Sequence, residues 1–250
     1  MFSLKDKSMQ FFDNMRTQRE ENLQQVYKIE KAPSDSGMRT ILDGVKITDF
    51  HRVFKGLVEK LRAAGIWRNY EYYQGYMVAA IDGVHYFSSE CIGCDMCSIY
   101  TKKKQSKQTG ALIEVKENRH YLLSGVIVHP DKKEVMPVIH EPILRKDGTE
   151  KNDCEQNASK RLLPRLRKQF PDEKIVIVED SLGSNGPHIE AIHGEGFKFI
   201  LGIKPKGNKY LFELMNRLET QGKTLFHEEK RAGKIHRYRC LLYTSPSPRD

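Results

Sequence analysis

YMVAAID (residues 76–82) and KIVIVED (residues 174–180) are the two stretches that decide the fold of this chain. Each is a short apolar run that ends on an acidic residue. Residues 84–88 form a second extended run directly after Gly83, so we expect 76–82 and 84–88 to pair as a strand hairpin. The 174–180 run does not alternate apolar and polar residues, which predicts a strand buried on both faces of a sheet.

Further elements are expected around these two runs. In chain order they are strands at 120–129 and 134–140 joined by a turn at Pro130-Asp131, a basic amphipathic helix at about 153–170, a short helix at 188–193, a strand at 197–204, a helical stretch at 209–218 and a β-hairpin at 225–242 around Ala232-Gly233. The apolar side of the long helix is Ala158, Leu162, Leu163 and Leu166, and Pro164 should kink or restart it. Residues 1–70 are polar and helical, with a break at 33–36.

The composition indicates a globular protein that binds nucleic acid. Of 250 residues, 38% are hydrophobic and 30% are charged, which excludes a disordered chain. The 42 Lys and Arg residues outnumber 33 Asp and Glu residues, for a net charge of +9 and a pI near 9.2. Such an excess is typical of proteins that contact phosphate backbones, although a basic protein without that role is the alternative. No apolar run approaches the roughly 20 residues of a membrane span, so we expect no membrane partner.

Asp82 and Asp180 are the candidate catalytic and metal-binding residues, because each follows an apolar strand. A carboxylate at the end of a buried strand is costly to desolvate unless a positive partner is present. Carboxylates from two neighbouring strands can hold Mg²⁺ ions whose shells phosphate oxygens complete. Two ions about 3.5–4 Å apart can activate an attacking water or 3′-hydroxyl and stabilise the leaving oxygen. The competing interpretation is that each Asp only caps a turn, as Asp before Gly or Ser often does.

Three blocks of sequence carry a resemblance to a known family. They are YQGYMVAAIDGVHYFS (residues 73–88), GVIVHPDKKEVMPVIHEP (125–142) and VEDSLGSNGP (178–187). Together they are similar to the core blocks of DDE transposases of bacterial insertion sequences, and SDSGMRTILDGV (34–45) resembles the N-terminal helical region of those proteins. The resemblance covers about residues 30–239. It assigns the family's first catalytic acid to Asp82 and the second to Asp180.

This resemblance implies a fold and a division into regions. The fold is α/β, a ribonuclease-H-like mixed sheet flanked by helices. The implied regions are a helical N-terminal region for DNA binding or dimerisation at 1–70, a partial catalytic core at 71–205, a helix and the start of a β-rich insertion at 206–239, and a tail at 240–250 that looks like translated adapter sequence rather than native protein.

The same resemblance implies a reaction. Asp82 and Asp180 would hold two Mg²⁺ ions, for which Mn²⁺ can substitute. Water would free a 3′-hydroxyl at a transposon end, and that hydroxyl would attack target DNA. The implied partners are double-stranded DNA, both transposon ends and target, and a second copy of the chain in a homodimer. The implied location is the bacterial cytoplasm, in association with the nucleoid.

The third acid of the family is missing from the pattern. It lies on a later helix in a Tyr-x2-Arg-x3-Glu-x6-Lys type signature, which this sequence does not contain. Glu213 on the 209–218 stretch is a substitute, with a solvated helix face as the alternative. We therefore expect a truncated enzyme that is inactive, or nearly so, by itself. A non-catalytic DNA-binding remnant of a transposase and a hydrolytic nuclease of the same fold stay open as alternatives.

Three further clusters are candidates for binding. Cys91, Cys94 and Cys97 form a C-x2-C-x2-C motif that could share a Zn²⁺, with His85 or His120 as a fourth ligand; a loop of reduced thiols is the alternative. The basic clusters Lys102, Lys103, Lys104 and Lys107, and Lys204, Lys206 and Lys209, could follow a DNA backbone, although solvated loops would have the same sequence.

Overall fold

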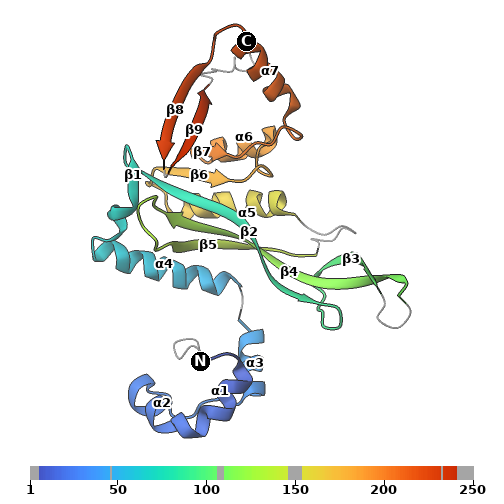
Figure 1. Cartoon of the computed structure of the whole chain (residues 1–250). Helices are drawn as coiled ribbons and strands as arrows, with labels where there is room; N and C mark the ends of the chain where they lie inside the picture. The colour runs from blue at the N-terminus through green and yellow to red at the C-terminus, as the bar shows by residue number, and fades with distance from the viewer. Residues whose placement is uncertain (1–5, 46, 106–109, 146–153, 232, 241–250) are drawn as a thin grey trace. The chain divides into compact units, whose positions relative to one another are not determined.

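The computed structural model describes residues 6–45, 47–105, 110–145, 154–231 and 233–240 (Figure 1). The chain divides into two compact units, Met1–Ala64 and Gly65–Asp250. Among the described residues, none of the helices combines the length and the apolar character that crossing a membrane requires.

The first unit is helical, as the sequence predicts. Its helices are α1 (Met9–Arg16), the 3-10 turn η2 (Thr17–Arg19), α2 (Glu20–Tyr27), α3 (Asp35–Asp43) and α4 (Ile47–Ala63). Ser34, in the predicted break, caps α3 by accepting a hydrogen bond from the Gly37 N–H. Phe12 of α1 and Leu23 of α2 are buried, so a small apolar core holds these helices together.

The second unit is built on a mixed sheet of seven strands. They are β1 (Glu71–Tyr73), β2 (Tyr76–Ser89), β3 (Ser98–Gln105), β4 (Leu112–Val128), β5 (Met136–Ile143), β6 (Ile175–Glu179) and β7 (Lys198–Leu201). The order is β3-β4-β2-β6-β7, with β1 beside β2 and β5 beside β4. β6 pairs in parallel with β2 and β7, whereas the other pairs are antiparallel. The antiparallel strands of the first half and the parallel strands of the second half therefore meet at β2.

The hairpin predicted for 76–88 is wrong. β2 is one continuous strand that pairs with β4 from Val78 opposite Val128 to Ser89 opposite Asn118, with an irregularity between His85 and Phe87. Gly83 pairs within this ladder and makes no turn. β3 and the N-terminal half of β4, with which it pairs, project from the body of the sheet (Figure 1). We call this projection, residues 98–105 and 112–119, the β3–β4 arm.

β6 lies between β2 and β7, as a central strand should. Ile175 and Ile177 are buried on one face, whereas Val176 and Val178 on the other face are only half-buried. The prediction of burial on both faces is therefore only partly confirmed. The face with the isoleucines supplies the core of this unit.

Helix α5 (Glu155–Gln169) covers the β4–β5 part of the sheet with the apolar side predicted for it. The expected restart at Pro164 is wrong, because α5 runs through Pro164 as one helix. Leu162, Leu163 and Leu166 are all fully buried around the proline, and this packing offsets the hydrogen bond that proline cannot donate. At the helix end, Phe170 stacks on Trp67 of the 3-10 turn η3 (Trp67–Tyr70), with ring centroids 5.3 Å apart.

The remaining elements confirm the predicted pattern. α6 (Gly186–Gly194) packs beside α5, and α7 (Lys209–Thr220) precedes the hairpin of β8 (Leu225–Arg231) and β9 (Lys234–Cys240). Asn185 caps α6 by accepting from the His188 N–H, and Pro187 occupies the first turn, where its missing donor costs nothing. Leu241 and Leu242 of the predicted hairpin lie outside the described residues.

Candidate active site

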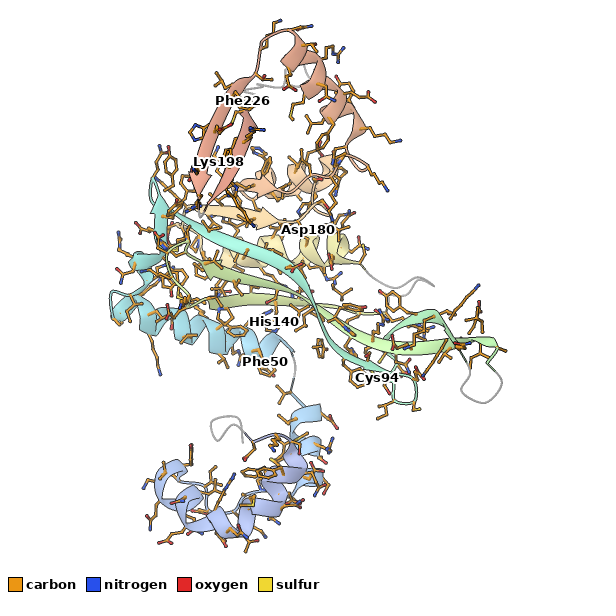
Figure 2. The ribbon with its side chains drawn as sticks, in the orientation of Figure 1. Phe50, Cys94, His140, Asp180, Lys198 and Phe226 are labelled. Atoms are coloured by element: carbon orange, nitrogen blue, oxygen red, sulfur yellow. The ribbon has the colours of Figure 1, made fainter. Side chains whose placement is uncertain are left out.

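The register of two parallel strands brings Asp82 and Asp180 to the same edge of the sheet. Ala80 of β2 lies opposite Val178 of β6, and each aspartate stands two residues further along its chain. Asp180 follows directly after the last residue of β6 (Figure 2). Both aspartates line one pocket, so the two residues singled out from the sequence do meet in space.

That pocket is acidic beyond the two predicted residues. Its lining is Ile81, Asp82, Leu123, Glu155, Gln156, Ser159, Glu179, Asp180, Leu182, Gly183 and His188. Glu155 is the first residue of α5, and Glu179 is the last residue of β6. The sequence pattern singles out neither glutamate, so the pocket gathers more carboxylates than predicted.

Glu155 reaches the pocket because Gly83 has no side chain. A Cβ added at Gly83 would stand 2.7 Å from the Glu155 Cδ and closer still to its Oε1, so any side chain there would displace the glutamate. A glycine inside a strand marks close approach of another group. That signal is present in the sequence, although the expected hairpin makes Gly83 a turn residue.

Glu179 is a largely covered carboxylate of this pocket. Its side chain is 10% exposed, and the His188 Nε2–H donates to its Oε2 over 2.6 Å. Its other oxygen, Oε1, is buried and has no hydrogen-bond partner among the described residues, and the same holds for Ser159 Oγ. The pocket therefore contains buried oxygen atoms without a hydrogen-bond partner among the described residues. Leaving such atoms unsatisfied destabilises the folded state unless a cation or a water molecule binds them.

The aspartates themselves are more exposed than their positions in the sequence predict. Asp82 and Asp180 are both exposed, so the expected desolvation of these two carboxylates is wrong. The strand edge where they stand is the mouth of the pocket. Asp82 Oδ1 accepts from the Gly83 N–H and Asp180 Oδ1 from the Leu182 N–H, each over 2.8 Å. The turn-capping interpretation thus holds for one oxygen of Asp180, and it does not compete with a metal on the other oxygen.

Electrostatic repulsion between these acids acts on Glu155. Burial raises the pKa of its carboxyl group above the ordinary 4.5, and the charges of Asp82, Asp180 and Glu179 raise it further. A cation among these carboxylates would relieve that repulsion and lower the pKa of Glu155 again.

Replacing Glu155 with Gln should therefore raise the melting temperature of the metal-free protein at neutral pH. Because the folded state has the higher pKa, it binds this proton more tightly than the unfolded chain, and stability is lost as the pH rises from 4.5 through the folded pKa. The gain should shrink as the pH falls towards 4.5, which thermal scans across this range would measure. Glu190→Gln, an exposed change on α6, is the control; an equal gain for both variants would contradict the prediction.

A basic loop begins beside Asp180. The Gly202 N–H donates to the Glu179 carbonyl oxygen over 2.9 Å, and a Cβ at Gly202 would lie 3.3 Å from backbone atoms of Asp180 and Ser181. Lys204 and Lys206 follow on this loop and are exposed. The expectation that these lysines follow a strand ending near the acids is confirmed.

The other predicted cations and the substitute acid are located elsewhere. Lys102 pairs with Glu117 and Glu90, and Lys104 pairs with Glu90, so two of the lysines of this run are partly neutralised by ion pairs. Lys107 lies outside the described residues. Glu213 is exposed on α7 and is not among the residues that line the acidic pocket.

A wider groove adjoins the acidic pocket and shares Glu155, Gln156 and Leu182 with it. Its aromatic side chains are Tyr100 of β3 and Tyr121 of β4, with ring centroids 5.9 Å apart. The Arg119 guanidinium lies 4.8 Å from the centre of the Tyr100 ring. The acids thus open onto a groove with aromatic side chains.

The cysteine motif is only partly brought together. Among the described residues, Cys94, Cys97 and His120 form the one group whose ligand atoms all lie within 4.8 Å of one another. Cys91 is exposed and outside this group, and the His85 ring contacts the Phe87 carbonyl oxygen and Tyr121 instead.

No protein-family model and no curated protein matches this chain.

Proposed function

We propose that this chain is part of a DNA transposase that cleaves at transposon ends and transfers the strand into target DNA, with divalent metal ions held by Asp82 and Asp180. The observation that carries the proposal is the parallel register of β2 and β6, which sets these two carboxylates side by side at the mouth of an acidic pocket.

The order of elements supports a ribonuclease-H-like core. That fold requires three antiparallel strands, a helix, a central strand, a helix and a strand, and the chain has β2, β4, β5, α5, β6, α6 and β7 in this order. β3 is an addition that extends β4 outward as part of the β3–β4 arm. Asp180 then follows directly after the central strand, and Asp82 lies within β2 just past the stretch that pairs with β6.

The donors in the pocket fit Mg²⁺ or Mn²⁺. Both ions prefer carboxylate oxygens, and Mg²⁺ typically takes one or two carboxylates and completes its shell with water and phosphate. The unpartnered Glu179 Oε1 and the raised pKa of Glu155 both indicate that this pocket holds more carboxylate oxygens than its own hydrogen-bond donors satisfy. Two bound ions would supply an activated oxygen nucleophile and stabilise the leaving oxygen.

The side chains around the acids have complementary roles in this proposal. Asp82 and Asp180 each keep one oxygen on a backbone N–H, which fixes the carboxylate orientation, and turn the other towards the ions. Glu155 adds a further carboxylate beside the two aspartates, and a bound cation would offset the repulsion that raises its pKa. Tyr100 and Tyr121 offer faces on which unpaired bases can stack.

Lys204 and Lys206 should contact the DNA backbone. The double variant Lys204→Ala/Lys206→Ala should weaken binding to a duplex of arbitrary sequence and lower the slope of log K against log salt by about 0.9 for each phosphate that the variant no longer neutralises. Fluorescence anisotropy at several salt concentrations measures both quantities. Lys132→Ala/Lys133→Ala is the control, because it removes the same charge at the β4–β5 turn. This turn follows Val128, which pairs with Val78 near the start of β2, at the opposite end of the strands from Asp180. An equal decrease of slope in both variants would contradict this assignment.

The proposed activity is tested by assays of DNA cleavage and joining. We expect the 250-residue chain to bind duplex DNA but to cleave it little, because the family's third acid is not in its sequence. The 250-residue chain, and any longer reading frame found when the source DNA is read past codon 240, should be assayed with Mg²⁺ or Mn²⁺ on labelled DNA ends that flank the gene. Cleavage and joining that Asp82→Asn abolishes would support the transposase. Cleavage without joining would indicate a hydrolytic nuclease, and DNA binding without metal-dependent cleavage a non-catalytic remnant.

A further inference from the structure

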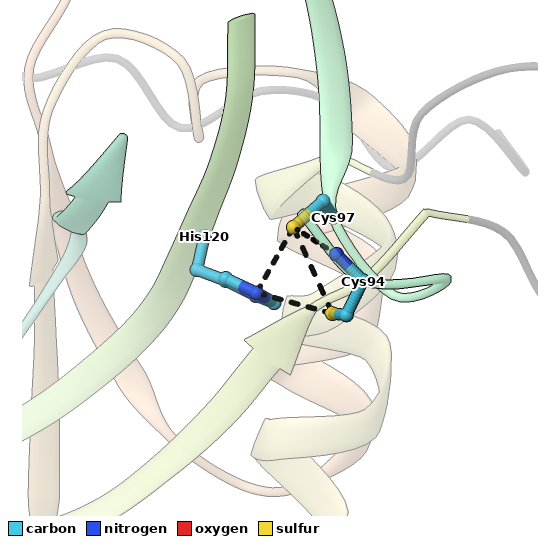
Figure 3. Close-up of side chains that lie close together, drawn as sticks. All are labelled: Cys94, Cys97 and His120. Atoms are coloured by element: carbon cyan, nitrogen blue, oxygen red, sulfur yellow. Dashed lines mark hydrogen bonds between the residues drawn. The ribbon is translucent and has the colours of Figure 1, made fainter. Parts of the chain in front are cut away.

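Three potential metal ligands converge at the base of the β3–β4 arm, away from the acidic pocket (Figures 2 and 3). The Sγ atoms of Cys94 and Cys97 are 3.7 Å apart, and His120 Nε2 lies 3.4 Å from the first and 3.2 Å from the second. The two cysteines belong to the connection between β2 and β3, whereas His120 belongs to β4. Segments distant in sequence thus direct three donor atoms at one point.

The triangle of donor atoms has the dimensions of a tetrahedral zinc site. With Zn–S of about 2.3 Å and Zn–N of about 2.0–2.1 Å, two sulfurs of a tetrahedron stand about 3.8 Å apart and a sulfur and a nitrogen about 3.5 Å apart. The observed separations are 3.7, 3.4 and 3.2 Å. A small outward movement of the imidazole would complete the match. A disulfide would need the sulfurs about 2.05 Å apart, so the cysteines are not in that geometry.

The surroundings fix these side chains in place. Cys97 is 1% exposed, and the Cys94 N–H donates to its Sγ over 3.3 Å, which holds this sulfur in position. The Cys97 N–H donates back to the Cys94 carbonyl, which closes a tight turn around the two sulfurs. The rings of Tyr86 and Phe87 lie 5.7 and 5.5 Å from the His120 ring and orient it.

We propose that Cys94, Cys97 and His120 bind one Zn²⁺ ion, which fastens the β2–β3 connection to β4. The fourth position of the tetrahedron is open to water or to Cys91, a further thiol of the same loop. Zinc is favoured over harder ions because two thiolates and an imidazole are its preferred donors, whereas Mg²⁺ and Ca²⁺ take oxygen. This zinc site does not depend on the proposed transposase activity, so the experiments on zinc binding and on the acidic pocket can succeed or fail separately.

The site is tested on the full chain, purified under reducing conditions without added metal and then titrated with Zn²⁺. We expect one zinc per chain by elemental analysis, and an X-ray absorption spectrum that fits at least two sulfurs at about 2.3 Å and one nitrogen at about 2.0–2.1 Å. Co²⁺ in its place should give thiolate-to-metal charge transfer and the intense visible bands of tetrahedral cobalt. Chelation should raise hydrogen exchange in residues 90–105 and leave β6 unchanged.

Substitutions separate the removal of a ligand from misfolding. His120→Ala and Cys94→Ser should each weaken zinc binding by more than the roughly 10–100-fold that removal of an outer-shell partner costs. His120→Cys keeps a ligand at the position and should retain the zinc, and Cys240→Ser, an exposed thiol on β9, should change nothing. Zinc that stays in Cys94→Ser/Cys97→Ser would overturn the site. So would a folded wild-type chain that takes up no zinc, or one that carries a Cys94–Cys97 disulfide under the reducing conditions.

Discussion

Replacing Asp82 or Asp180 with asparagine should weaken Mn²⁺ binding by at least about 100-fold, because even the removal of an outer-shell partner costs roughly 10–100-fold. Asparagine keeps an Oδ1 for the backbone N–H groups of Gly83 and Leu182, so the local backbone should survive while the charge is removed. Titration of the purified chain, with free Mn²⁺ followed by electron paramagnetic resonance, gives the affinity and the number of ions.

The control for this experiment is Glu213→Gln. It removes one carboxylate from the exposed face of α7, outside the acidic pocket, and should leave the Mn²⁺ affinity unchanged. If Glu213→Gln weakened binding as much as Asp82→Asn, the ion would be held by general surface charge. If neither aspartate variant changed the affinity, the pocket would have no role in metal binding.

The second large effect concerns the buried pair below the aspartates. His188→Ala leaves the largely buried Glu179 carboxylate without its hydrogen-bond donor, and stranding a buried charged acceptor costs about 3 kcal/mol. Trp67 is the single tryptophan of the chain and is buried against Phe170, so its fluorescence during urea denaturation reports on the unit that contains this pair.

Two further variants test whether this destabilisation comes from the loss of the Glu179 hydrogen-bond partner. Glu179→Gln added to His188→Ala removes the stranded charge and should recover part of the stability. His193→Ala, on the exposed side of the same helix, removes only an edge-to-face packing with Phe199 and should cost no more than about 1.5 kcal/mol. A His188→Ala effect no larger than that of His193→Ala would show that Glu179 does not depend on its partner.

The elements of the sheet could largely be predicted, because a strand is a local pattern of apolar residues. The strands at 120–129 and 174–180 and the apolar side of α5 are all present at about the predicted positions. Gly83 could not be judged in the same way. A glycine that makes a turn and a glycine that admits another chain segment have the same local sequence, and the segment it admits, at Glu155, is over 70 residues away.

The acidic pocket and the Cys94, Cys97 and His120 site could be predicted from the sequence to different degrees. Asp82 and Asp180 end apolar runs, so both could be found, whereas Glu155 begins a helix and looks like an ordinary acidic residue of a first turn. The C-x2-C-x2-C spacing predicts a thiol cluster, but only the pairing of β2 and β3 with β4 selects His120 over His85 and separates Cys91 from the group. Spacing along the chain identifies donors, and strand pairing decides which of them meet.

The most direct test of the central claim is a crystal grown with Mn²⁺ and measured at a wavelength where manganese scatters anomalously. We expect anomalous density at the mouth of the acidic pocket, within bonding distance of carboxylate oxygens of both Asp82 and Asp180 and absent from the Asp82→Asn variant. Manganese bound only elsewhere on the chain, or an empty pocket at saturating Mn²⁺, would contradict it.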